Sequence, residues 1–164
     1  MIIALTGYMG SGKTTVGRIV ADALGCPFLD LDELVVSREG RSIEEIFRAD
    51  GEDRFRRAEE EALAFALRKY SQGDLVLALG GGTILSAASR KQLREHALCI
   101  WLDAPAEVLR GRIGTGSGRP LADEAFASRL TERLPLYEEV AEVTIDTSAL
   151  SPQDVADEII ISCL

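Results

Sequence analysis

Residues 7–14 have the types and spacing of a phosphate-binding loop, the pattern G-x-x-x-x-G-K-[ST]. Its glycines let backbone N–H groups converge on phosphate oxygens, and the following helix adds its positive end. Lys13 is expected to reach the β- and γ-phosphates, and Thr14 Oγ to bind Mg²⁺. A glycine-rich turn without a ligand is the simpler alternative. The pattern predicts a nucleotide site made by Gly10, Ser11, Gly12, Lys13, Thr14 and Thr15.

Two more groups follow predicted strands, namely Asp30 with Asp32 and the triplet Gly80-Gly81-Gly82. Ligands bind beyond the carboxyl ends of parallel strands, so both groups are expected beside the phosphate loop. If the strand persists, the two aspartates share a face, where one would hold Mg²⁺ and the other a substrate hydroxyl. Helix capping, with Asp32 as a cap, is the alternative. The triplet lets a backbone approach a ligand closely, or forms a flexible turn.

Arginines supply candidate contacts for an anionic substrate, because a guanidinium stays charged and matches a carboxylate in bidentate geometry. Arg56 and Glu59 share one side of a predicted helix, where a surface ion pair is the simpler interpretation. Arg119 follows the glycine-rich stretch 114–118, which predicts a cation on a mobile lid, and Arg112 precedes it.

Short apolar runs alternate with helical periodicity along the chain. The runs fall at 2–5, 28–29, 75–79, 98–102 and 143–145. The predicted helices include 13–24, 33–39, 42–49, 52–70, 105–111, 122–133 and 152–162. Apolar strands alternating with helices indicate a parallel sheet covered on both faces, which is the doubly wound α/β class. No linker or repeat divides the 164 residues, so one domain spanning 1–164 is expected.

The net charge limits which classes of binding partner are expected. Eighteen Lys and Arg against 27 Asp and Glu give a net charge of −9, which disfavours nucleic acid and anionic membranes. The three cysteines lie far apart and His96 is the only histidine, so no zinc site is indicated and reduced, packed thiols are expected. With no apolar run long enough to span a bilayer and no basic leader, the expected location is the cytoplasm.

Taken together, these residues resemble the shikimate kinase family over nearly the whole chain. The specific part is the series Asp30-x-Asp32, Gly40-Arg41-Ser42-Ile43-x-x-Ile46-Phe47, Gly51-Glu52-x-x-Phe55-Arg56-x-x-Glu59, Gly80-Gly81-Gly82, Arg119-Pro120-Leu121 and Arg133-x-Pro135-Leu136-Tyr137. One departure is Ala122, where the family often has a second leucine. The resemblance implies transfer of a phosphoryl group from ATP, with Mg²⁺, to the 3-hydroxyl of shikimate. It also implies a P-loop, five-stranded sheet in the order 2-3-1-4-5.

The resemblance also implies residue roles on the acceptor side. Asp32 would hydrogen-bond the shikimate hydroxyls, either removing a proton or only aligning the hydroxyl. Arg56 and Arg133 would grip the shikimate carboxylate. The same pocket would be lined by Gly80, Gly81, Gly82, Phe47 and Phe55.

On the nucleotide side, Asp30 would help to hold Mg²⁺ by similarity, and Arg112 and Pro152 would sandwich the adenine ring. Arg119 would descend from the lid onto the transferring phosphate, which makes Lys13, Asp32 and Arg119 the catalytic residues. The lid is expected near 112–122 and the acceptor-binding helical part near 32–60.

Two alternatives stay open. A gluconate-type small-metabolite kinase would also need arginines, although Phe55-Arg56-x-x-Glu59 with Gly80-Gly81-Gly82 favours shikimate. A catalytically idle ATP-binding protein is disfavoured because none of the expected functional residues is missing. The expected partners are the small molecules ATP and shikimate, and a monomer is the default.

Overall fold

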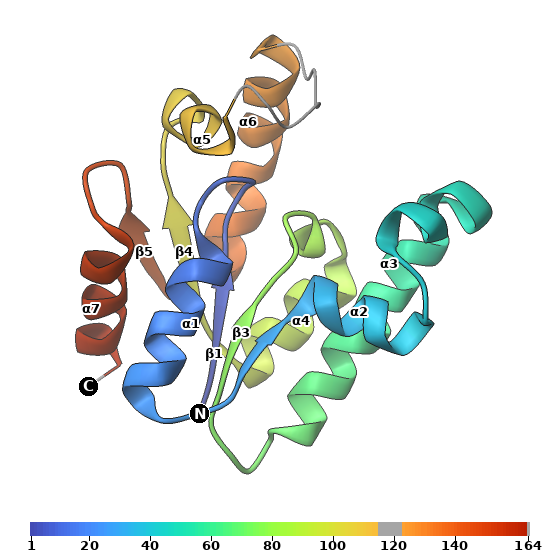
Figure 1. Cartoon of the computed structure of the whole chain (residues 1–164), viewed down its shortest axis with the longest axis horizontal. Coiled ribbons are helices and arrows are strands. Elements are labelled where there is room, and N and C mark those ends of the chain that lie inside the picture. The colour runs from blue at the N-terminus through green and yellow to red at the C-terminus, as the bar shows by residue number, and fades with distance from the viewer. Residues whose placement is uncertain (115–122, 164) are drawn as a thin grey trace.

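A parallel five-stranded sheet forms the centre of the computed structural model, which describes residues 1–114 and 123–163 (Figure 1). The strand order is β2-β3-β1-β4-β5, as predicted. In the chain, the strands are β1 Ile2–Thr6, β2 Phe28–Asp30, β3 Leu75–Ala78, β4 Leu98–Asp103 and β5 Val143–Asp146. All pairings are parallel, so the carboxyl ends of the strands meet at one edge of the sheet.

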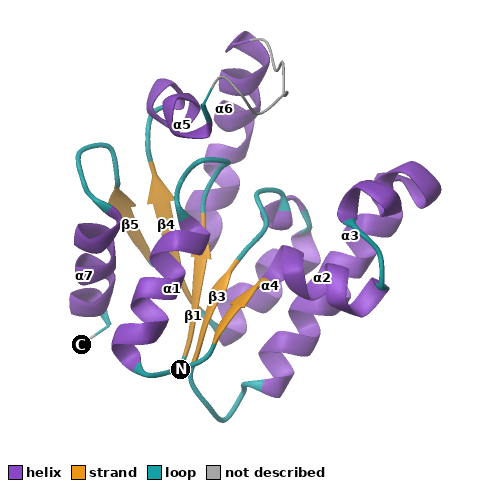
Figure 2. Ribbon diagram, viewed as in Figure 1, coloured by secondary structure: helices purple, strands orange, loops and turns teal. Residues whose placement is uncertain are grey.

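Helices connect the strands and cover both faces (Figure 2). They are α1 Lys13–Leu24, α2 Leu31–Glu39, α3 Ile43–Lys69, α4 Ala87–His96, α5 Ala106–Ile113, α6 Asp123–Val140 and α7 Pro152–Ser162, with the short 3₁₀ helix η1 at Thr83–Leu85. Over residues 1–114 and 123–163, no helix combines the length and apolarity needed to cross a membrane.

The alternation of side chains along β1 divides the core in two. Ile2 and Ala4 join the cluster formed with α3, α4 and α6, whereas Ile3 and Leu5 pack with α1 and α7. Successive side chains of a strand point to opposite faces, so an unbroken apolar run is what a strand covered on both sides requires. The doubly wound class predicted from these runs is therefore confirmed.

Some predicted boundaries were right and others were wrong. The predicted division between 42–49 and 52–70 is present, because α3 kinks at Gly51, whose backbone is non-helical (φ 80°, ψ 176°). Strand β3 ends at Ala78, one residue early, and Gly81 and Gly82 form a turn that leads into η1. Helix α6 passes through Pro135 to Val140 instead of stopping at 133. At Pro135, tertiary packing overrides the local breaker signal of proline.

Candidate active site

The phosphate loop joins the end of β1 to the start of α1. Lys13 begins α1, and its Nζ donates to the carbonyl oxygens of Gly7 (2.7 Å) and Tyr8 (3.2 Å) and to Ser11 Oγ (3.3 Å). Burial lowers the pKa of Lys13 to about 8, while the carboxylates of Asp32 and Asp30 work in the opposite direction. The ammonium therefore lies folded over its own loop, at the place where a nucleotide tail would neutralise it.

Asp30 has two structural partners. Its Oδ1 accepts from the backbone N–H groups of Asp32 (2.9 Å) and Glu33 (3.4 Å), so Asp30 is the N-cap of α2. The alternative interpretation, helix capping, is thus right for Asp30 and wrong for Asp32. The predicted shared strand face was wrong as well, because β2 ends at Asp30 and Asp32 lies in the first helical turn.

The second carboxylate oxygen of Asp30 accepts from Thr14 Oγ1 at 2.7 Å. Two hard oxygen donors so close together are the ligand type that Mg²⁺ prefers. Among residues 1–114 and 123–163, no group of three metal-ligating side chains occurs. The pair fits Mg²⁺ in the type of its oxygen donors.

Asp32 lies where the two halves of the site meet. Its pKa is raised to about 6 by burial and by the carboxylates of Asp30 and Glu59, and is pulled back by Lys13 and Arg56. A cation of the phosphate loop and an arginine of α3 therefore both act electrostatically on this carboxylate. A carboxyl group with a pKa of about 6 is mainly ionised at neutral pH and can accept a proton there.

The glycines after β3 make room for charged side chains. A Cβ on Gly80 would lie 2.8 Å from both Asp32 Oδ1 and Glu59 Oε2, and one on Gly82 would lie 2.6 Å from the Arg56 Nη atoms. At these two positions a side chain would collide with the polar groups of the site. The triplet therefore leaves room for the protein's own charged side chains, whereas the predicted close approach to a ligand stays a prediction.

Glu59 is buried and its partner Arg56 is partly buried, which corrects the simpler interpretation of a surface pair. The Glu59 side chain is 2% exposed; its Oε1 accepts from Arg56 Nη1 at 2.9 Å and its Oε2 from Thr83 Oγ1 at 2.9 Å. Arg56 Nη2 also donates to the exposed Glu52 at 3.4 Å. The guanidinium lies 5.1 Å from the ring centre of Phe55. The buried Glu59 thus binds Nη1 of Arg56, while Nη2 of Arg56 lies on the side of the exposed Glu52.

Two rings stand beside this arginine. The Phe47 and Phe55 ring centres are 4.9 Å apart, and Phe47 is 38% exposed whereas Phe55 is buried. A large apolar ring left open to solvent next to a charged pair is available to cover the apolar ring of a small ligand.

Arg133 reaches the same place from α6. Its Nη1 donates to Gly81 O at 2.9 Å, and its guanidinium lies 5.2 Å from the ring centre of Tyr8. Tyr137, one turn further along α6, donates from its hydroxyl to Gly81 O at 3.3 Å, and burial raises its pKa to about 12. Arg133 also contributes to the low pKa of Lys13, so both cations face the phosphate loop.

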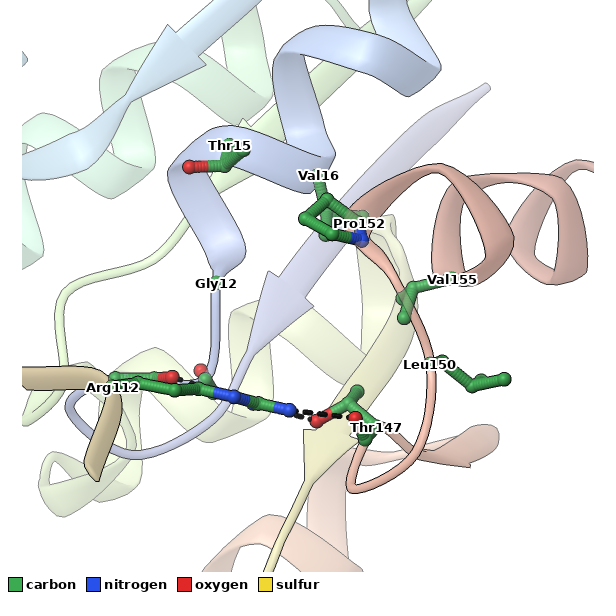
Figure 3. Close-up of a pocket in the computed structure, with 10 residues that line it drawn as sticks. Gly12, Thr15, Val16, Arg112, Thr147, Leu150, Pro152 and Val155 are labelled. Carbon is green, nitrogen blue, oxygen red and sulfur yellow. Dashed lines mark hydrogen bonds between the residues drawn. The ribbon is translucent and has the colours of Figure 1, made fainter. Parts of the chain in front are cut away.

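A separate cavity of about 310 Å³ borders the phosphate loop on its other side (Figure 3). Arg112 and Pro152 lie across it from each other, with Thr15 and Val16 of α1 nearby. Arg112 is fixed there because it donates to Thr147 O (2.6 Å) and Thr147 Oγ1 (2.9 Å). A flat guanidinium facing a proline ring is suited to enclose an aromatic base.

The structure thus brings together most of the predicted residues. Around the carboxyl edge of the sheet lie Lys13, Thr14, Asp30, Asp32, Phe47, Phe55, Arg56, Gly80, Gly81, Gly82 and Arg133, with Arg112 and Pro152 in the adjoining cavity. Arg119 and most of the expected lid lie outside the described residues. Sequence reasoning missed Thr83 and Thr147, because single hydroxyl residues carry no spacing signal.

Comparisons with known proteins agree with this geometry. The family model for shikimate kinase matches residues 9–164. The shikimate kinase of Symbiobacterium thermophilum is 43% identical over 167 aligned residues, covering 97% of this chain and 94% of its own.

Solved structures give the same result. A shikimate kinase from Acinetobacter baumannii in complex with shikimate superposes with a TM-score of 0.87 at 36% identity, covering 99% of this chain and 92% of its own. A gluconokinase from Sinorhizobium meliloti reaches a TM-score of 0.65 at 23% identity, covering 97% of this chain and 89% of its own, and shares the fold alone. This chain belongs to the shikimate kinase family.

Proposed function

We propose that this chain transfers the γ-phosphoryl group of ATP to the 3-hydroxyl of shikimate, giving shikimate 3-phosphate and ADP. The observation that carries the proposal is the position of Asp32, whose pKa responds to Lys13 of the phosphate loop and to Arg56 of the acceptor side. A nucleotide tail and an organic acid would meet at this carboxylate.

On the nucleotide side, Lys13 would release its loop carbonyls and bind the β- and γ-phosphates. Thr14 and Asp30 would hold Mg²⁺, which neutralises phosphate charge when bound. Arg112 and Pro152 would enclose the adenine, and Gly10, Ser11, Gly12 and Thr15 would complete the nucleotide site.

On the acceptor side, Arg56 and Arg133 would hold the shikimate carboxylate, with Phe47, Phe55 and the glycine triplet shaping the pocket. Asp32 would accept the hydrogen bond of the attacking hydroxyl and orient its oxygen toward the phosphate. Arg119, in the stretch outside the described residues, is proposed to stabilise the transferring group from a lid spanning about 112–122.

These roles belong to one domain over 1–164, with an acceptor-binding part near 32–60. We further propose a cytoplasmic monomer without nucleic-acid or membrane partners, supported by the net charge of −9.

The test couples ADP release to added acceptor, comparing shikimate, gluconate and no acceptor, with phosphorus NMR to identify the product. Release that requires shikimate and yields the 3-phosphate is expected. Release on gluconate but not on shikimate would overturn the acceptor assignment. No release on any acceptor, with ATP still bound, would instead favour the catalytically idle alternative.

A further inference from the structure

Arg90, which lies outside the site, ties the loop after β3 to α6. From α4, its Nη1 donates to the carbonyl oxygens of Ile84 (2.9 Å) and Leu85 (3.3 Å) at the end of η1. Its Nε donates to Glu139 Oε2 on α6 at 2.8 Å. The Arg90 side chain is 16% exposed and that of Glu139 is 34% exposed, so the guanidinium is better shielded from water than its carboxylate partner. One guanidinium therefore joins the segment after the glycine triplet to the helix that carries Arg133.

Helix α6 contains a proline close to Arg133. Pro135 lies inside the helix, two residues after Arg133. Proline has no N–H and crowds the carbonyl four residues earlier, so the helical hydrogen-bond ladder is interrupted at this point. Contacts with other elements then contribute more to the direction of the following turn. Those contacts include Tyr137 with Gly81 O and Glu139 with Arg90.

We propose that Arg90, acting with Glu139, is a positioning residue that holds η1 and α6 at the separation at which Arg133 reaches both Gly81 and an acceptor carboxylate. The inference rests on the proposed function, because it takes Arg133 to bind that carboxylate. Arg90 itself touches no reactant. An ordinary surface ion pair contributes little to stability. Arg90 differs from such a pair because it also donates to two backbone carbonyl oxygens.

The matched control is Arg94, on the same face of α4. Arg94 Nη1 donates to Glu139 Oε1 at 2.6 Å, and its side chain is 48% exposed. It makes no hydrogen bond with Ile84 or Leu85. Comparing Arg90 with Arg94 therefore separates the link to the loop from the ion pair with Glu139.

The experiment measures steady-state kinetics of Arg90→Gln and Arg94→Gln. Arg90→Gln should raise the KM for shikimate about tenfold, while kcat and the KM for ATP stay within about twofold. Arg94→Gln should change none of the three by more than about twofold. An unchanged KM for shikimate in Arg90→Gln, or an equal rise in both variants, would overturn the proposal.

A double-mutant cycle with Arg133→Ala tests whether Arg90 acts through Arg133. Adding Arg90→Gln to Arg133→Ala should raise the KM for shikimate by less than about twofold more. A merely structural role would give full additivity, and additivity would overturn the proposal. If Arg90→Gln does not fold, Glu139→Gln replaces it in the cycle, with the same two outcomes.

Failure of the proposed function would look different. A wild-type enzyme that uses shikimate, with Arg90→Gln unchanged, overturns the positioning role alone. A wild-type enzyme that ignores shikimate overturns the proposed function, and amide hydrogen exchange then decides the positioning role. Faster exchange in 83–85 and 133–140 of Arg90→Gln would support the link between η1 and α6, and unchanged exchange would refute it.

Discussion

The nucleotide side and the acceptor side of this site are built in different ways. The phosphate-binding part of the nucleotide side is one contiguous loop, where Lys13 already bonds to carbonyl oxygens five and six residues away. The acceptor side draws Asp32, Arg56 and Arg133 from three helices, and only contacts distant in sequence bring them together. We infer that a change in the loop removes the chemistry, whereas a change on the acceptor side mainly alters affinity.

The largest effect is expected at Lys13. Lys13→Ala should lower kcat by about 10³-fold or more, because the cation that neutralises the transferring group is lost. Stopped-time ADP assays at saturating shikimate measure this change, and Lys91→Ala, which removes an exposed lysine, is the control. A Lys13→Ala activity within tenfold of wild type would contradict the inference that a change in the phosphate loop removes the chemistry.

Arg56→Ala should act on acceptor affinity instead. We expect the KM for shikimate to rise about 10- to 100-fold, as for loss of a charge-assisted hydrogen bond, with the KM for ATP nearly unchanged. The exposed neighbour Arg57→Ala is the matched control. If both KM values rose together in Arg56→Ala, the two sides would not be separable as we describe.

Gly82→Ala should repeat this effect in weaker form. The new Cβ would push the Arg56 guanidinium aside, so we expect about a 5- to 10-fold higher KM for shikimate. Little stability should be lost, because the guanidinium is the flexible end of the Arg56 side chain. Gly73→Ala, whose Cβ would meet nothing within 4 Å, is the control. An unchanged KM in Gly82→Ala would show that Arg56 tolerates displacement.

The smallest effect concerns stability and pH. The pKa of Asp32 is raised from 3.8 to about 6, so ionisation costs more in the folded protein than in the unfolded chain. Asp32 therefore lowers the free energy of unfolding of the wild type as the pH rises from 3.8 to about 6. Asp32→Asn should raise the free energy of unfolding by about 1 kcal/mol at pH 7 and by nothing below pH 4. Urea unfolding at several pH values measures the difference.

The same ionisation should govern activity. Because the carboxylate form of Asp32 is proposed to accept the hydroxyl hydrogen bond, kcat/KM for shikimate should fall as pH drops through about 6. A pH profile of the wild type that stays flat from pH 7 to 5 would contradict this role.

Much of the nucleotide side could be predicted from sequence because its signal is local. Strand, loop and helix follow within 24 residues, and the unbroken apolar runs indicate a sheet covered on both faces. The boundaries of the helices were harder to predict from the sequence. Pro135 signals a break in isolation, yet packing of α6 against the sheet carries the helix through it.

The acceptor side was predicted through resemblance more than through periodicity. An arginine and a glutamate three residues apart look like a surface pair, and only the fold reveals that Glu59 is buried beneath Thr83. The sequence contains no signal for Thr83 or Thr147 either, because their partners, Glu59 and Arg112, lie far along the chain. Such contacts depend on the assembled sheet.

The hydrogen bond between Arg56 and Glu52 has a consequence for which acids this pocket can retain. The Glu52 carboxylate already accepts a hydrogen bond from Arg56 Nη2. The carboxylate of an incoming acid would therefore replace that of Glu52 instead of binding an unpaired guanidinium. The gain from that swap is small by itself, and a simple carboxylate such as acetate should dwell only briefly. Retention then requires a molecule whose ring and hydroxyl groups make further contacts at the same time.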